Sequence, residues 1–105
     1  MITIDAFKKH ALSFPETSEQ PHFEKTSFRF GKKIFATLSL EKKLACLKLS
    51  ELDQSVFCAF DKTIIYPVNN KWGKQGWTLM ELSKVKPAMA RDALGVAYQE
   101  VARIK

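Results

Sequence analysis

The sequence predicts an α+β domain, and three observations lead to this fold class. Apolar residues recur with a helical period near both ends of the chain and with the strand period of two in the middle. The predicted order of helix, strands, short helix, strands and helix suits an α+β arrangement. The 105 residues, 46% of them hydrophobic and 27% charged, suffice for one core, so we expect a single domain over residues 1–105.

The first helix is predicted to run from the capping residue Thr3 to about Ser13. Its apolar positions share one face and are Ile4, Phe7, Ala11 and Leu12. Residues 14–21 (FPETSEQP) follow as a polar connection, because the residue before each of its two prolines is disfavoured in the helical conformation.

A period of two begins after His22 and predicts three antiparallel strands. In the first, Phe28 and Phe30 flank Arg29. Residues 31–33 form a turn, and the second strand, residues 34–40, has an apolar face consisting of Ile34, Ala36, Leu38 and Leu40. Residues 41–43 form another turn, and in the third strand the side chain of Lys48 points away from the apolar face, which consists of Ala45, Leu47 and Leu49.

The second half of the chain begins with a short helix that Ser50 and Asp53 cap. Its apolar face is formed by Leu52, Val56, Phe57 and Phe60. Residues 63–68 predict a brief strand that Pro67 restricts to a sheet edge. Residues 77–82 alternate again, and we expect the ring of Trp77 to pack into the core.

Residues 69–76 (NNKWGKQG) are predicted to connect these two strands, because asparagine and glycine tolerate the backbone angles of turns. Pro87 suits the first turn of the last helix. The apolar stripe of that helix consists of Leu94, Ala97, Tyr98, Val101 and Ile104.

Several functional classes find little support. No apolar run approaches the roughly 20 residues that cross a bilayer, and the first ten residues lack the order of a secretion signal, so we expect a cytoplasmic protein. Cys46 and Cys58 are predicted to be buried free thiols, because neither has a partner at metal-ligand spacing. His10 and His22 are the only histidine bases, and no phosphate-binding glycine loop is present. We therefore expect no enzyme activity, cofactor or metal.

The net charge of +6 suits contact with a polyanion, because lysines on phosphates release counterions. Four lysines are predicted at hairpin turns, namely Lys32, Lys33, Lys42 and Lys43, while Lys71 and Lys74 surround Trp72. An alternative is that the turn lysines keep sheet edges from aggregating. Trp72 is interpreted either as an exposed stacking platform or as a lid over the open face of the sheet.

Four stretches occur together in this order: PHFEKTSFRFGKKIFATL from Pro21, ACLKLS from Ala45, VNNKWGKQGW from Val68 and ALGVAYQEVA from Ala93. In this combination the chain resembles the MmcQ/YjbR family of small bacterial proteins. The resemblance implies a CyaY-like (frataxin-like) antiparallel sheet with helices on one face, and a DNA-binding role in which two hairpins form a double wing. The matching positions are His22, Lys25, Arg29, Lys33, Lys48, Trp72, Gly73, Gly76 and Trp77. Iron binding is not implied, because Lys8, Lys9 and His10 stand where frataxins have acidic residues.

We therefore expect a monomeric, non-enzymatic protein that binds double-stranded DNA through phosphate contacts. The predicted binding residues are His22, Lys25, Arg29, Lys32, Lys33, Lys42, Lys43, Lys48, Lys71, Trp72 and Lys74. The alternative is a small-molecule or protein-binding module. Its ligand would occupy the sheet face near His22, Arg29, Lys48 and Trp72.

Overall fold

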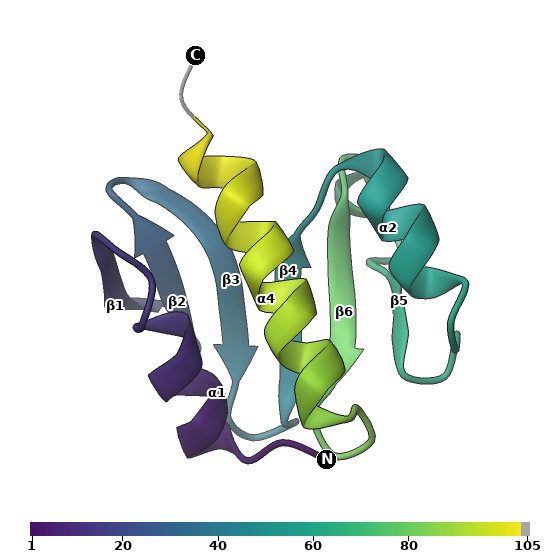
Figure 1. The fold of residues 1–105 in the computed structure, drawn as a ribbon, viewed down its shortest axis with the longest axis horizontal. Helices are drawn as coiled ribbons and strands as arrows, with labels where there is room; N and C mark the ends of the chain where they lie inside the picture. The colour runs from purple at the N-terminus through teal and green to yellow at the C-terminus, as the bar shows by residue number, and fades with distance from the viewer. Residues whose placement is uncertain (104–105) are drawn as a thin grey trace.

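The computed structural model describes residues 1–103, which form four helices and one six-stranded antiparallel sheet. The helices are α1 (Ile4–Ala11), α2 (Glu51–Cys58), α3 (Lys71–Lys74) and α4 (Pro87–Ala102). The strands are β1 (Thr17–His22), β2 (Lys25–Phe30), β3 (Lys33–Ser39), β4 (Leu44–Lys48), β5 (Ile65–Pro67) and β6 (Trp77–Glu81). Their order in the sheet is β1-β2-β3-β4-β6-β5, and α1, α2 and α4 lie on one face (Figure 1). The predicted α+β class is confirmed.

Side-chain caps fix where the helices begin. The backbone N–H of Ala6 donates to Thr3 Oγ1 at 3.1 Å, and that of Asp53 donates to Ser50 Oγ at 3.0 Å, as the sequence predicted. Helix α3 was not predicted. Its single turn begins where Asn70 Oδ1 accepts a hydrogen bond from the N–H of Trp72 at 2.8 Å. The expected connection between β5 and β6 therefore has a helical turn of its own.

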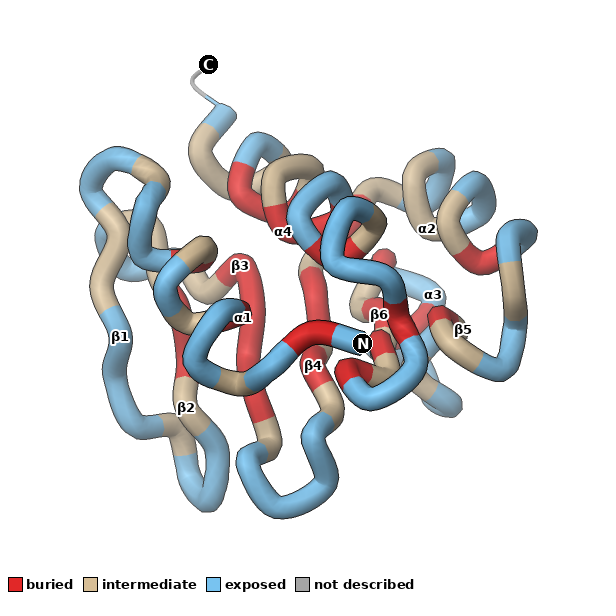
Figure 2. The backbone as a smooth tube through the Cα atoms, turned by 60° about the horizontal axis from the view of Figure 1, so that its bottom comes forward, coloured by how far each residue is buried: buried red, intermediate tan, exposed pale blue. Residues whose placement is uncertain are grey.

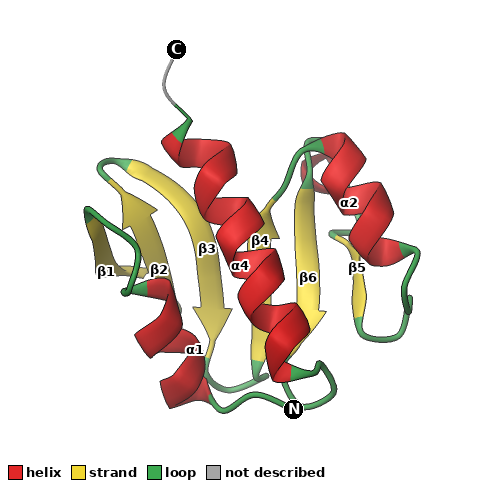
Figure 3. Cartoon of the chain, in the orientation of Figure 1, coloured by secondary structure: helices red, strands yellow, loops and turns green. Residues whose placement is uncertain are grey.

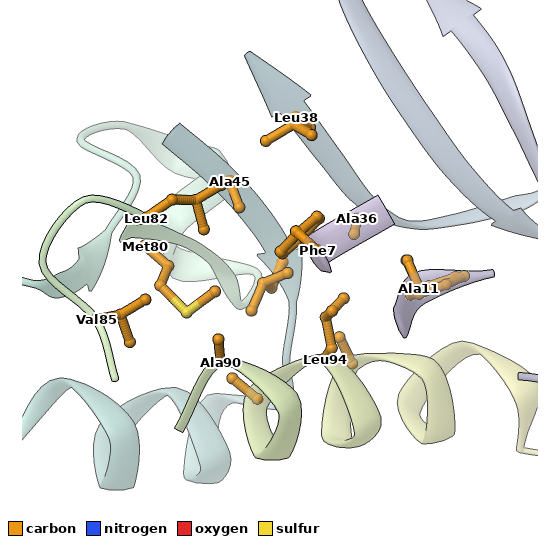
Figure 4. Packing of buried hydrophobic residues seen from close by; sticks show 14 of the residues in the cluster. Phe7, Ala11, Ala36, Leu38, Ala45, Met80, Leu82, Val85, Ala90 and Leu94 are labelled. Atoms are coloured by element: carbon orange, nitrogen blue, oxygen red, sulfur yellow. The ribbon is translucent and has the colours of Figure 1, made fainter. Parts of the chain in front are cut away.

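The core fills the space between the helix layer and the sheet. Figure 4 shows Ala90 and Leu94 of α4 facing residues of the sheet and Phe7 of α1. The rings of Phe7 and Phe28 meet edge to face, with centroids 5.9 Å apart. Burying one large apolar side chain is worth about 1.5–3 kcal/mol, so this layer is the main source of stability. No helix within residues 1–103 is long and apolar enough to span a membrane.

The prediction of a loop at residues 14–21 is wrong, because most of this segment belongs to strand β1. It is an edge strand that pairs with β2 from Thr17 opposite Phe30 to His22 opposite Lys25. Its residues are polar apart from Pro21, and Figure 2 shows it mostly outside the buried part of the chain. An edge strand with no apolar face shows no alternation of apolar and polar residues. Strand β1 could therefore not be predicted from a period of two in the sequence.

In β3 the side chain of Ile34 does not share a face with Ala36 and Leu38, contrary to the prediction. The pairing with β2 shifts between Phe28 and Arg29, so that Phe28 faces Ala36 while Arg29 faces Ile34. Phe35 is the extra residue of this bulge and lies fully in the core. As a result Ile34 is on the face opposite to the helices, and the predicted fourth member, Leu40, lies in the following turn.

Helix α2 also differs from the expected apolar face. Cys58 is buried and Phe57 packs against the core, whereas three predicted face residues are exposed by 62–75%: Leu52, Val56 and Phe60. The helix contacts β5 at the margin of the sheet (Figure 3), and its covered side contains Gln54, Phe57 and Cys58. The predicted apolar face is therefore wrong for Leu52, Val56 and Phe60, because the spacing of apolar residues does not show which side of a helix at the sheet margin is covered.

Candidate binding groove on the open face of the sheet

The face of the sheet opposite α1, α2 and α4 is built by the alternate residues of the same strands. One row of neighbours crosses the strands, with Ser27 opposite Thr37, Thr37 opposite Cys46, and Cys46 opposite Leu79. Trp77 begins β6 opposite Lys48 and is half-buried on this face. The expectation that Trp77 packs into the core is wrong, because Thr78 and Met80 take the core-facing positions of β6.

This open face contains a groove of about 600 Å³, a size usual for ligand sites. One wall is the β1–β2 hairpin, through His22 and Lys25, and the other is the segment from β5 to α3, through Val68 and Trp72. Lys42 lies at the β3–β4 turn. The floor belongs to β3, β4 and β6 and consists of Ile34, Thr37, Leu44, Cys46, Trp77 and Leu79. The groove thus combines an apolar, aromatic floor with cationic groups at its margin.

Two glycines hold the Trp72 wall in place. A Cβ atom on Gly73 would lie 1.9 Å from the carbonyl oxygen of Val68, and one on Gly76 would lie 1.8 Å from that of Leu49. Gly76 also has a φ of +103°, which side chains disfavour. The segment therefore depends on both glycines for its close approach to the neighbouring backbone.

Hydrogen bonds tie the same wall to the rest of the molecule. Gln54 Nε2 of α2 donates to the carbonyl oxygen of Gly73 at 2.8 Å, and Lys48 Nζ donates to that of Gln75 at 2.5 Å. Lys48, a predicted binding residue, thus braces the wall and lies outside the groove. Trp72 remains 49% exposed, and Lys71 Nζ is 5.7 Å from the centroid of its ring. The wall is fixed while its indole stays accessible.

The other predicted binding residues are spread over the sheet. Arg29 Nε donates to Ser27 Oγ at 3.0 Å, on the open face but beside the groove. Lys32 and Lys33 lie at the β2–β3 turn, and Lys42 and Lys43 lie at the opposite end of β3, roughly 20 Å away at the usual rise per residue. Lys74 lines a separate shallow depression next to Gln54. The structure therefore brings together His22, Lys25, Lys42 and Trp72, and separates the two lysine pairs.

The net charge is distributed unevenly between the two sides of the molecule. Residues 17–49 and 65–81, which hold the six strands and α3, contain nine of the 17 lysines and arginines but four of the 11 acidic residues. The other residues up to 103, which include α1, α2 and α4, contain seven basic and seven acidic residues. Within residues 1–103 the helix layer is thus balanced, and the sheet with its turns has an excess of five positive charges.

Two titratable groups on the open face are held in their neutral forms. Burial raises the pKa of Cys46 to about 11, although the nearby charge of Lys25 works against this shift. Cys46 is half-buried on the groove floor, whereas Cys58 is buried, so the expectation of buried free thiols holds fully for Cys58 alone. The hydroxyl of Tyr66 donates to Glu81 Oε2, and this hydrogen bond raises the Tyr66 pKa to about 12. At neutral pH Cys46 is therefore a thiol and a weak nucleophile.

The groove floor was missed by sequence reasoning, yet a signal for it exists. Because Ala45 and Leu47 alternate toward the core, Leu44 and Cys46 must lie on the opposite face. Apolar residues at positions expected to meet solvent indicate a surface with a ligand or partner. The same reasoning applies to Leu79 in β6.

Comparisons with known proteins agree with the architecture. The crystal structure of Deinococcus radiodurans protein DR2400, whose domain is described as DUF419, superposes with a TM-score of 0.83 at 20% sequence identity, over 98% of this chain and 80% of that one. This similarity establishes the fold alone. Comparison with curated proteins finds no significant match. A family model described as YjbR matches residues 12–100, which include both walls and the floor of the groove. The chain therefore belongs to the YjbR family.

Proposed function

We propose that the protein is a non-enzymatic, cytoplasmic DNA-binding protein whose sheet side contacts the phosphate backbone. The observation that supports this proposal is the charge distribution: within residues 1–103 the helix layer is neutral, and the sheet with its turns has an excess of five positive charges. Lysines on a folded surface attract phosphates without precise geometry and release condensed counterions. Such contacts position DNA but do not read its sequence, so no sequence specificity is proposed.

The arrangement of the hairpins also favours this function. The start of β2 pairs with the end of β3, so the β1–β2 and β3–β4 turns lie at the same end of the sheet. Glu24, Lys25, Glu41 and Lys42 line one small cleft between the two turns. In the proposal these turns are the two wings of a CyaY-like, double-wing arrangement, with Lys42 and Lys43 on phosphates and Lys25 between them.

The test is a titration of a fluorescein-labelled DNA duplex, followed by anisotropy at several salt concentrations. If three or more lysines contact phosphates, log K should fall against log salt with a slope of about −3 or steeper. The matched control combines Arg91→Ala in α4 with Arg103→Ala at the C-cap of this helix. It removes two charges from the helix side and should not change the slope. No binding at low salt, or a slope near zero, contradicts the proposal.

A second candidate function is the binding of a small, flat anion in the groove. It is favoured by the apolar floor, which phosphate contacts alone do not require, and by the imidazole of His22 and the cationic Lys25 and Lys42 at the margin. A thermal-shift screen with aromatic acids and nucleotides separates the two functions, because a ligand that binds the folded state raises Tm. A rise in Tm with a small anion, together with no rise with DNA, would favour the second function.

A further inference from the structure

We propose that the groove binds an unpaired nucleobase, so that the protein prefers single-stranded DNA to duplex DNA. The inference rests on the proposed DNA-binding function and concerns which form of DNA is bound. Contact with phosphates accounts for the lysines. It does not account for the aromatic floor of the groove, because a phosphate backbone has no group that would pack against it.

The groove offers the chemistry that a base requires. Trp72 is held on α3 by its Asn70 cap and by the close approach of Gly73 to Val68, yet its ring is 49% exposed. Base–aromatic stacking uses such a fixed and accessible ring, and it tolerates any base because every base has a π-face. Leu79 and Ile34 contribute apolar surface to the floor of the same groove.

A duplex does not present this chemistry. Its bases are already stacked on one another, and extruding one costs a few kcal/mol unless the strand is unpaired. The groove is sunk into the face of the sheet between the β1–β2 hairpin and α3. A single strand places a base in such a site without that cost.

The surrounding charges indicate a polymer instead of a free nucleotide. Lys42 and Lys43 lie at one end of β3 and Lys32 and Lys33 at the other, roughly 20 Å apart. Lys71 Nζ is 5.7 Å from the Trp72 ring centroid, where a phosphate next to a stacked base would meet it. Cations at both ends of a strand that contributes to the groove floor can hold the phosphates of a single strand beyond the stacked base.

The experiment compares a labelled 15-nucleotide thymidine strand with the same strand annealed to its adenine complement, by anisotropy at one salt concentration. We expect the wild-type protein to bind the single strand at least about tenfold more tightly than the duplex. Trp72→Ala should weaken single-strand binding about 5- to 150-fold and change duplex binding less than about twofold, since one stacked base is worth about 1–3 kcal/mol. Trp72→Phe should restore most of the loss because it retains a ring.

The matched control is Phe60→Ala, which removes a similarly exposed ring (62%) from the helix side and should leave both affinities unchanged. A thermal melt of each variant shows that it is folded. Equal affinity for the two forms, with no effect of Trp72→Ala, overturns the base site and leaves DNA binding intact. Competition by free thymidine monophosphate as effective as by the strand overturns the polymer ligand. Absence of binding to either form overturns the proposed function together with this inference.

Discussion

The two faces of the sheet are formed by the same strands, but their side chains have different roles. On the helix face, Phe28, Phe35 and Leu47 are almost fully buried, and packing dictates their size. On the open face, Cys46, Trp77 and Leu79 are partly buried in the groove floor and lie outside the core cluster. Packing in the folded state is therefore enough to explain the residues of the helix face. The second face has apolar and cationic groups that folding does not require.

The largest expected effect concerns stability. Phe28→Ala on the helix face should lower the free energy of unfolding by about 3–5 kcal/mol, because it leaves a cavity in a fully buried site. Trp72→Ala on the open face should lower it by less than about 1 kcal/mol, because half of that side chain is already in water. Urea denaturation followed by circular dichroism measures both. Similar losses for the two variants would remove the distinction between the faces.

The next effect concerns the wall of the groove. Gly76→Ala should destabilise the protein by about 2–5 kcal/mol, because the backbone has a φ of +103° and the new Cβ would meet the carbonyl of Leu49. Gly31→Ala is the matched control: its φ is +61° but no atom lies within 4 Å, so about 1–2 kcal/mol is expected. Equal losses in urea denaturation would show that close packing of the wall is not required.

A smaller effect concerns the ends of β3. Replacing both Lys42 and Lys43 by alanine should weaken DNA binding about tenfold at low salt and reduce the salt slope by about 2, for every sequence alike. The same change at Lys32 and Lys33 tests whether a bound strand reaches the opposite end of the sheet. We expect a weaker loss there, because these lysines lie away from the two neighbouring turns. Anisotropy with one oligonucleotide measures both variants, and unchanged affinity in the first would exclude the β3–β4 turn.

The smallest effect is a dependence on pH. The Tyr66 pKa is raised from 10.0 to about 12 by its hydrogen bond to Glu81, so the neutral hydroxyl favours the folded state. This stabilisation is fully present below pH 10 and is lost as the pH rises toward 12. The stability difference between wild type and Tyr66→Phe should therefore shrink above pH 10, as urea denaturation at pH 8 and pH 11 would show. If this difference in stability stayed the same at both pH values, the hydrogen bond between Tyr66 and Glu81 would not be the cause of the raised pKa.

Local chemistry made much of the helix face predictable. Thr3, Ser50 and Pro87 mark helix starts because capping and the missing N–H of proline act within one turn of the chain. Ala45 and Leu47 were placed correctly because β4 has core on one side and alternates cleanly. In these regions local preference and tertiary packing favour the same structure.

The residues of the open face were less predictable, because the pairing between strands determines which side chains lie on this face and which of them are neighbours. Trp77 is more apolar than Thr78, and the alternation of β6 was therefore assigned to the wrong face. Lys48 was expected at the site but donates to the wall that holds Trp72, a contact between residues far apart in the sequence. His22, Lys25, Lys42 and Trp72 were named from the sequence, but only the sheet order brings them around one groove.

An NMR titration of the isotopically labelled protein with a short DNA strand tests directly whether the open face of the sheet binds DNA. If the open face is the binding surface, backbone amide shifts should change in residues 20–49 and 65–81, most strongly around Trp72, Lys25 and Lys42. The helix layer should show little change, because its charges balance within residues 1–103. Its own groove also contains acidic residues, since Asp53, Asp92 and Glu100 lie there beside Arg91 and Arg103. Shift changes concentrated on α1, α2 and α4, with the groove unaffected, would contradict the account.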